Sequence, residues 1–373
     1  MSRVRRIVLL IISIFSTMFL SGCWDMKTFE DTGFILQLGL ELDDNGDLLY
    51  SVTMPVVEEE IDEKVEILYT TADLLREGRD KLRNTSGKRI EGGKTQQIHF
   101  SRELAEKGLG DILDDYMRSS ENPLLANITV VEGSPLEMYQ ISLNYEDKTR
   151  VAFYVTNLID DARKRTSTSE TRVYDYMIMQ KSKTIDPTAV HIRYDKEGIE
   201  ITGTALFNGD KMVGSLDSVQ SGLLHALMGN RINFSYFYRE TDQHTFQTGK
   251  SGIALGLKNV KRKIKFDLSG DIPKISMDLK ITSSLSEYDT MHQLDDPKSK
   301  KQIEEKVARS IKKDCEDILA YLQEIGADPI GFAEIARSKY NSFYKSVEWK
   351  KIYPDIEFIV DVKLSIVSQG AIN

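Results

Sequence analysis

The chain has 373 residues, 58 acidic and 49 basic side chains, and a formal net charge of −9. This excess of acid excludes nucleic acid as a favoured ligand, because the phosphate backbone would be repelled. At about 100 to 200 residues per domain, the length predicts two or three domains.

The first 22 residues have the layout of a secretory signal peptide. Arg3, Arg5 and Arg6 precede a run of 14 uncharged, mostly apolar residues that ends at Leu20. A spanning helix needs about 20 apolar residues, so the run predicts the apolar region of a cleaved signal. No later apolar stretch is long enough to cross a bilayer, and residues 23–373 are therefore expected to form an ectodomain held at a membrane surface.

The signal ends in Leu20-Ser21-Gly22-Cys23, which is the pattern of a lipobox. It predicts cleavage before Cys23 and attachment of lipid to that cysteine. Each buried methylene contributes about 0.8 kcal/mol, so two or three acyl chains would hold the protein firmly. The alternative is an uncleaved signal anchor with a chance cysteine, which the short apolar run disfavours. Cleavage removes three arginines and lowers the formal net charge to −12.

Residues 23–187 are predicted to form an N-terminal α+β domain. Alternating residues on both sides of Asp43–Gly46 predict a β-hairpin. Ser101 is expected to cap a helix that starts at Arg102 and is weakened in its middle by glycine. Further elements are expected in the order helix Thr70–Arg83, strand Lys94–Phe100, strand Asn127–Val131, a helix from Pro135, helix Tyr154–Arg165 and a polar surface loop Thr166–Thr171.

Residues 188–245 and 246–373 are predicted to form a middle and a C-terminal α+β domain. In the middle domain we expect two strands up to Phe207, an Asn208-Gly209 turn and a helix Ser218–Met228. In the last domain we expect paired strands Val260–Leu268 and Ile275–Ile281, helices Pro297–Ile325 and Ile330–Tyr340, and a final strand Ile356–Ile366. The fold class is thus α+β, with three mixed domains in series, each with a sheet packed against helices.

The sequence contains no recognisable catalytic or metal-binding motif. His99, His191, His225, His244 and His292 are scattered singly, without the spacing of a zinc site, and are expected to be structural or surface residues. Asp43, Asn45 and Asp47 match the start of a calcium loop. The match fails at the sixth position, Leu48, and at the twelfth, Met54. We therefore predict no catalytic residue, no metal and no cofactor.

Two further features allow a functional and a structural interpretation. Cys315 lies in a charged helical stretch with no second thiol or histidine nearby, so a small helix-face residue is favoured over a nucleophile or a metal ligand. Lys258–Lys265 is the single basic concentration in the chain. It could contact anionic lipid headgroups, but its period-two alternation favours a solvated strand face.

Several segments resemble the Ger(x)C family of spore germination lipoproteins. Cys23-Trp24-Asp25 is similar to the start of the mature family members. Four later segments resemble family motifs in the family's order: Leu38–Asp43, Gly93–Leu109, Gly203–Leu216, and Trp349 to Gly370. The chain departs from the family at Arg118–Pro123, where members commonly carry an Arg-Asp-Pro-Glu turn, so no role of that turn is carried over.

The resemblance implies a three-domain α+β lipoprotein on the outer face of the inner spore membrane. It implies a C subunit of a nutrient germinant receptor, working beside a multi-spanning A subunit and a transporter-like B subunit in the response to amino acids or sugars. The family has no established catalytic residues, so only the lipidated Cys23 is carried over. The alternative is an extracytoplasmic lipoprotein that itself binds the small-molecule nutrient in an interdomain cleft. Direct nutrient binding stays open at this point.

Overall fold

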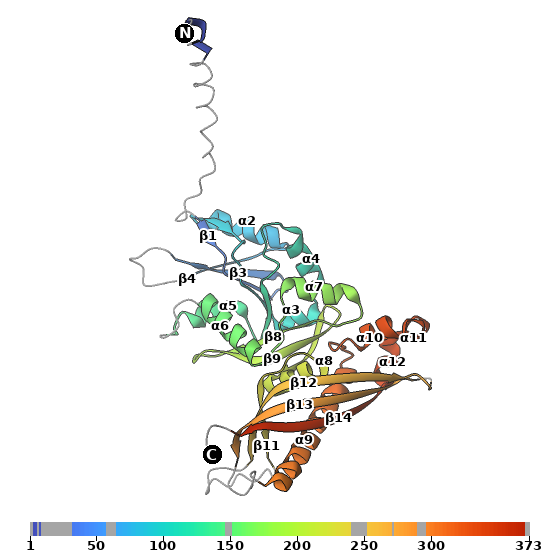
Figure 1. Cartoon of the computed structure of the whole chain (residues 1–373). Coiled ribbons are helices and arrows are strands. Elements are labelled where there is room, and N and C mark those ends of the chain that lie inside the picture. Colours follow the sequence, from blue (N-terminus) through green and yellow to red (C-terminus); the bar gives the residue numbers. More distant parts are fainter. Residues whose placement is uncertain are drawn as a thin grey trace.

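The structure is a computed structural model that describes residues 3–5, 7–8, 32–56, 65–145, 151–239, 252–270, 272–288 and 296–369. Its first half is built on an eight-stranded sheet and its second half on a four-stranded sheet (Figure 1). A two-stranded pair, β1 (Thr32–Phe34) with β5 (Arg89–Glu91), completes the three sheets of the described chain. The expected mixture of strands and helices is confirmed.

The eight-stranded sheet has a parallel centre and antiparallel ends. Its order is β10-β9-β8-β7-β6-β2-β3-β4. The four central strands run parallel: β2 (Gln37–Leu42), β6 (Gln97–Ser101), β7 (Asn127–Val131) and β8 (Thr188–Tyr194). The flanking strands are β3 (Leu48–Pro55), β4 (Val65–Thr71), β9 (Ile199–Asn208) and β10 (Lys211–Asp217). These four strands are almost entirely buried, as is usual for parallel strands in the middle of a sheet.

Helices cover both faces of this sheet. One apolar core lies under α2 (Leu75–Thr85), α3 (Arg102–Lys107), α4 (Gly110–Arg118) and α7 (Val173–Ser182). The other lies under α5 (Pro135–Ser142) and α6 (Val151–Lys164). Under α5 and α6 the strands also present a polar layer, in which Gln37 Nε2 lies 3.1 Å from His99 Nε2.

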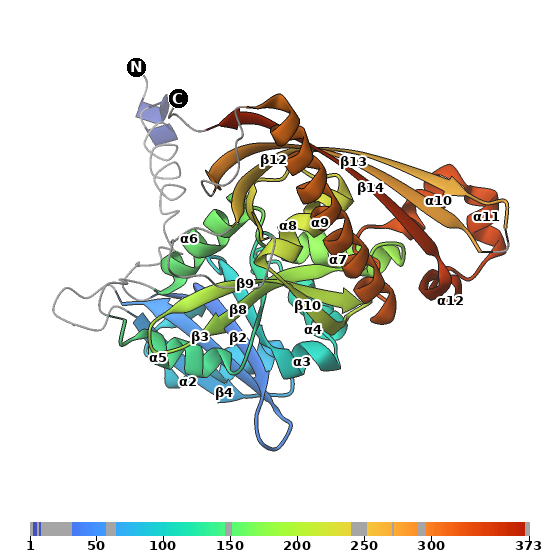
Figure 2. The same ribbon diagram turned by 90° about the horizontal axis from the view of Figure 1, so that it is seen from below.

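The four-stranded sheet has the order β11-β12-β13-β14. Its strands are β11 (Phe234–Tyr238), β12 (Ile253–Asp267), β13 (Lys274–Tyr288) and β14 (Glu357–Gln369), the last parallel to β13. Helix α8 (Ser218–Met228) and the long α9 (Pro297–Glu324) cover one face (Figure 2). The short helices α10 (Phe332–Lys339), α11 (Asn341–Ser346), α12 (Trp349–Ile352) and η1 (Tyr353–Asp355) lie at one end of the strands.

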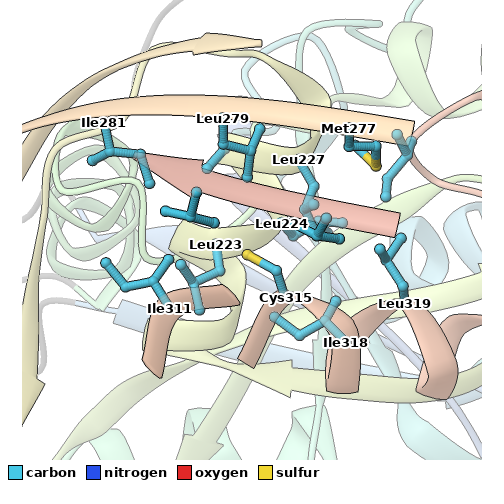
Figure 3. Packing of buried hydrophobic residues seen from close by; sticks show 14 of the residues in the cluster. Leu223, Leu224, Leu227, Met277, Leu279, Ile281, Ile311, Cys315, Ile318 and Leu319 are labelled. Carbon is cyan, nitrogen blue, oxygen red and sulfur yellow. The ribbon is translucent and has the colours of Figure 1, made fainter. Parts of the chain in front are cut away.

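The core of the second half lies between this sheet, α8 and α9. Figure 3 shows Leu223 and Leu227 of α8 facing Leu279 of β13, with Ile311 and Cys315 of α9 closing the layer. The same α8 also packs against β9 and β10. Helix α8 therefore joins the two sheets through one continuous set of contacts.

Two aspartates tie the second half to the eight-stranded sheet. The Asp328 N–H donates to Asp186 Oδ2 at 2.8 Å, and the Asp186 N–H donates to the Asp328 carbonyl oxygen at 3.1 Å. Asp186 Oδ1 also accepts from the Gly209 N–H at 2.8 Å. This aspartate junction is buried and joins segments 142 residues apart in the chain.

Most expected elements are confirmed. The hairpin joins β2 to β3 with Leu42 opposite Leu48, and α8 has the expected bounds. Ser101 Oγ accepts from the Leu104 N–H at 3.2 Å, as expected of a cap. The helix it starts ends at Lys107, however, because Gly108 adopts φ +126° and separates α3 from α4.

Two expectations are wrong. The helix predicted from Thr70 starts at Leu75, because Thr70 and Thr71 end strand β4. The Thr166–Thr171 stretch, expected to be a surface loop, holds three buried side chains, Thr168, Ser169 and Thr171. The physical reason is that α8 and β9 cover it, since Thr168 Oγ1 donates to the Gly203 carbonyl oxygen.

The three domain ranges stay a prediction. The eight-stranded sheet runs across the expected boundary at residues 187 and 188, because β8 pairs in parallel with β7. The middle segment therefore extends the N-terminal sheet with β8, β9 and β10. The predicted signal peptide and Cys23 lie outside the described residues, apart from two short helical pieces at 3–5 and 7–8.

Candidate functional site

The described histidines are held in structural contacts. Burial lowers the pKa of His99 to about 3, so this side chain is neutral at physiological pH. His191 Nε2 lies 2.8 Å from Glu132 Oε1, and burial lowers the pKa of His191. His225 Nε2 donates to the Thr168 carbonyl oxygen at 2.8 Å. His244 and His292 lie outside the described residues.

Cys315 is a fully buried residue of α9. Burial raises the pKa of its thiol, so the reactive thiolate is disfavoured. Figure 3 shows its sulfur between Leu223 and Leu224 on one side and Ile318 on the other. The interpretation as a small helix-face residue is confirmed, and the structure adds that the residue is buried.

The basic stretch forms part of strand β12. Lys261, Lys263 and Lys265 are exposed on the face away from α9, as the solvated-strand interpretation predicts. Arg262 points the other way and donates to the Leu227 carbonyl oxygen at 2.6 Å. Cross-strand pairing places Lys261 beside Lys280, and Lys280 beside Lys363 of β14. Membrane contact through these lysines stays a prediction.

A cavity lies where α6, α7, α8 and strands β8 and β9 meet. Its volume is about 770 Å³, within the usual size range of small-molecule sites. Its lining residues come from five elements and two loops: Arg163, Lys164, Thr166, Thr168, Ser169, Glu170, Thr171, Asp175, Ile178, Met179, Thr188, Thr204, Leu224, His225, Met228, Asn230, Arg231 and Asn233. It thus lies between the eight-stranded sheet and the helix that joins both sheets.

The loop between α6 and α7 is anchored at several points along this cavity. Thr166 adopts φ +47°, and its hydroxyl accepts from the Asn233 N–H at 3.0 Å. Thr171 Oγ1 and Thr188 Oγ1 lie 3.1 Å apart and satisfy each other. Thr168 also forms hydrogen bonds with Gly203 of β9 and His225 of α8. The loop that forms this part of the cavity wall is therefore held by several hydrogen bonds.

Three polar groups in the cavity wall lack partners within the described chain. They are the Ser169 hydroxyl, the Thr204 hydroxyl and the Arg163 Nε–H. Ser169 is 5% exposed, Thr204 is 1% exposed and the Arg163 side chain is 10% exposed. All three atoms have almost no accessible surface, so they lie behind the cavity lining, where a molecule in the cavity does not reach them.

Sequence reasoning did not select these three residues. The Thr166–Thr171 stretch has no hydrophobic period, and its polar composition predicts a surface loop. Arg163 is charged and close to the predicted end of a helix, where an exposed cation is the usual finding. Only the tertiary contact with α8 and β9 reveals that these side chains are buried.

The described ranges contain neither a metal-binding cluster nor a membrane-spanning helix. In them, no group of three or more histidine, cysteine, aspartate or glutamate side chains could hold a metal ion. Within the same ranges, no helix combines the length and the apolar character that a membrane span requires.

Comparison with known proteins connects the fold to one family. The family description "Spore germination protein N-terminal domain" matches residues 25–194, and "Spore germination B3/ GerAC like, C-terminal" matches residues 202–370. The two matches together extend over nearly the whole chain after residue 24. The cavity draws its lining from both matched segments.

Full-length relatives and a solved structure agree with these matches. The chain is 22% identical to spore germination protein GerQC of Bacillus cereus, over 98% of this chain and 99% of the relative. It is 22% identical to spore germination protein B3 of Bacillus subtilis, over 97% and 99% of the two chains. The crystal structure of the GerBC protein has a similar fold, with a TM-score of 0.60 and 13% identity over 92% of this chain and 100% of that one.

Proposed function

From the premise that the chain belongs to the GerAC family of spore germination proteins, the C subunits of germinant receptors, we propose a membrane-anchored subunit required for nutrient-triggered germination. The observation that supports this most is the pair of family matches in order along the chain, together with full-length relatives. The family is non-enzymatic, and the chain is accordingly a receptor subunit and not an enzyme.

We propose that Cys23 carries the anchor. The lipobox ends at Cys23, and the first family match begins at residue 25, so the lipidated residue would lead directly into the matched domain. Two or three acyl chains give firm attachment, whereas one chain is marginal. We propose that the ectodomain then lies on the outer face of the inner spore membrane, beside the A and B membrane subunits; membership of the family supports this proposal.

Replacing Cys23 with alanine tests the anchor. We expect Cys23→Ala to lose lipid, to move from the membrane to the soluble fraction of the spore, and to lower the germination rate strongly. Cys315→Ala is the matched control, since Cys315 is buried in the ectodomain and is not the proposed lipid attachment site. This variant should stay membrane-bound, as the wild type does. A Cys23→Ala protein that remains firmly bound after removal of the signal would contradict lipidation as the anchor.

A second candidate function is direct nutrient binding by this subunit. The observation that favours it is the cavity of about 770 Å³ between α6, α7, α8, β8 and β9, whose lining comes from both matched segments. Both functions are compatible within one receptor subunit.

A further inference from the structure

We infer that the open face of the four-stranded sheet docks on an anionic membrane surface through a group of five lysines. Three of them lie on β12, one on β13 and one on β14: Lys261, Lys263, Lys265, Lys280 and Lys363. Together they form the lysine face. The inference rests on the membrane-anchored subunit proposed above and deepens it, because it names the side of the ectodomain that lies against the lipid.

The strand register places the five side chains on one side of the sheet. Lys261, Lys263 and Lys265 alternate along β12, and all three are exposed. Lys261 lies opposite Lys280, and Lys280 lies opposite Lys363, so these three form a row across neighbouring strands. Helices α8 and α9 pack against the other side of the strands (Figure 2), so the lysines point away from the core.

The charge of the lysine face is incompletely compensated by its neighbours. Like charges directly opposite each other in a sheet are destabilising, and here three follow one another across strands about 4.8 Å apart. Within the described chain, none of the five lysines forms an ion pair, whereas Lys274 and Glu357 at the end of the same strands pair at 2.7 Å. Asp278 and Asp361 lie in the next row, so cations outnumber anions on this side of a chain whose net charge is −9.

The shape and composition of the face favour a lipid surface over a protein partner. Protein interfaces are depleted in lysine and serine and centre on buried aromatic or arginine anchors. Here the residues around the lysines are small and polar, with one exposed apolar side chain among them: Asn259, Ser276, Thr282, Ser365 and the apolar Ile359. Lysines spread over a sheet match a broad anionic surface, where each cation strengthens binding about fivefold.

The proposed anchor keeps this face close to the membrane. Cys23 lies nine positions before Thr32, the first residue of β1, and a chain of that length spans at most about 30 Å. Attachment to lipid makes docking an intramolecular step, so contacts from a few lysines suffice. The lysine face then orients the ectodomain, and the lipid retains it at the membrane.

Quenching of a fluorescent dye on the face tests this in the mature lipoprotein, reconstituted into vesicles. Thr282→Cys places the dye in the row beside Lys280, and Cys315 is buried and takes no label. The vesicles contain equal parts of phosphatidylcholine and phosphatidylglycerol, or phosphatidylcholine alone, with a quencher on a trace of neutral headgroups. We expect quenching in the anionic vesicles alone, and its loss at about 1 M salt, where the Debye length falls to about 3 Å. Asp44→Cys, in the turn between β2 and β3, is the position control and should stay unquenched.

Lysine variants separate the charge of the face from its shape. The row variant Lys261→Gln/Lys280→Gln/Lys363→Gln should lower the equilibrium constant for docking about 100-fold, at about fivefold per lysine. Its melting temperature should stay or rise, because like charges that lie opposite each other are removed. The matched control removes three exposed lysines from the other half and should dock as the wild type does: Lys94→Gln/Lys107→Gln/Lys196→Gln.

Three results would overturn the inference: the face dye stays unquenched in anionic vesicles, it is quenched equally without phosphatidylglycerol, or the row variant docks as tightly as the control. Release of the face by inorganic phosphate would also overturn it, because a free anion and not a lipid surface would then be the ligand. So would protection of Thr282→Cys from labelling in spores but not in vesicles, which would assign the face to an acidic protein. A lipoprotein that floats with the vesicles without quenching leaves the anchor intact, whereas loss of flotation refutes the anchor itself.

Discussion

Gly203→Ala is expected to destabilise the protein by about 4 kcal/mol or more, which places it among the largest single-residue effects. A Cβ at Gly203 would lie 2.0 Å from the Leu216 carbonyl oxygen and 2.7 Å from the Asp217 carbonyl carbon. Both are backbone atoms of the last two residues of β10, so no side-chain rotation relieves the contact. Gly203 also adopts φ +150°, a conformation that residues with a Cβ rarely adopt.

Gly46→Ala is the matched control for this substitution. Gly46 also has a positive φ, +86°, but nothing lies within 4 Å of its added Cβ. It should therefore lose only about 1 kcal/mol from backbone strain. Urea unfolding of both variants measures the difference. Equal losses for the two variants would show that β9 and β10 do not approach each other as closely at Gly203 as described.

Asp328→Ala is expected to lower the free energy of unfolding by about 3 kcal/mol, because it removes the cap of α10. The Asp328 carboxylate accepts from the N–H groups of Gly331, Phe332 and Ala333 at 2.9 to 3.0 Å. Helix α10 starts at Phe332, so the N–H groups of its first turn have no partner within the helix. Asp296→Ala, which removes an exposed cap from α9, should lose no more than about 1 kcal/mol. Equal losses would contradict a buried cap.

The same carboxyl group makes stability depend on pH. Burial raises the pKa of Asp328 to about 7, with the nearby Asp186 contributing, although its three N–H bonds act in the opposite direction. The folded protein then holds a proton that the unfolded chain releases near pH 4. This contribution to stability is complete below about pH 4 and is lost as the pH rises through 7.

Asp328→Asn, which cannot titrate, isolates this effect. Relative to the variant, the wild type should lose up to about tenfold in its folding equilibrium constant per pH unit across the window from about pH 4 to about pH 7. Melting temperatures measured at half-unit steps provide the comparison. Parallel curves for the two proteins would show that Asp328 does not change its proton occupancy on folding.

Local chemistry explains which elements could be predicted from the sequence. The turn Asn208-Gly209 and the helix Ser218–Met228 depend on neighbouring residues, and both formed as expected. Asp217 even makes a capping box with Gln220, the kind of local hydrogen bonding that sequence patterns report well.

Long-range contacts explain what could not be predicted. Asp186 and Asp328 are unremarkable in sequence. They form a junction only because the turn between α9 and α10 packs against the segment before β8, which also accepts a bond from the turn between β9 and β10. Thr168 and Ser169 are buried because Gly203 and α8 cover them. The parallel order of β2, β6, β7 and β8 likewise depends on how successive helices cross the sheet, which no short sequence pattern specifies.

The family resemblance and the structure together explain the Gly203–Leu216 hairpin, whereas Cys23 depends on the sequence alone. The segment Gly203–Leu216 was matched to a family hairpin, and the structure supplies the reason for its first glycine, since β10 backbone occupies the space a side chain would need. Cys23, in contrast, rests on sequence alone, because it lies outside the described residues.

Germination of spores that lack this gene, on a panel of single nutrients, is the most direct test of the receptor-subunit role. A plasmid copy of the wild-type gene and one of Gly203→Ala serve as positive and negative complementation controls. Loss of the response to one class of nutrient, restored by the wild-type copy alone, is the predicted result. Normal germination on every nutrient would contradict a role of this chain in nutrient-triggered germination, provided that it is also seen in strains that lack the other germinant receptors.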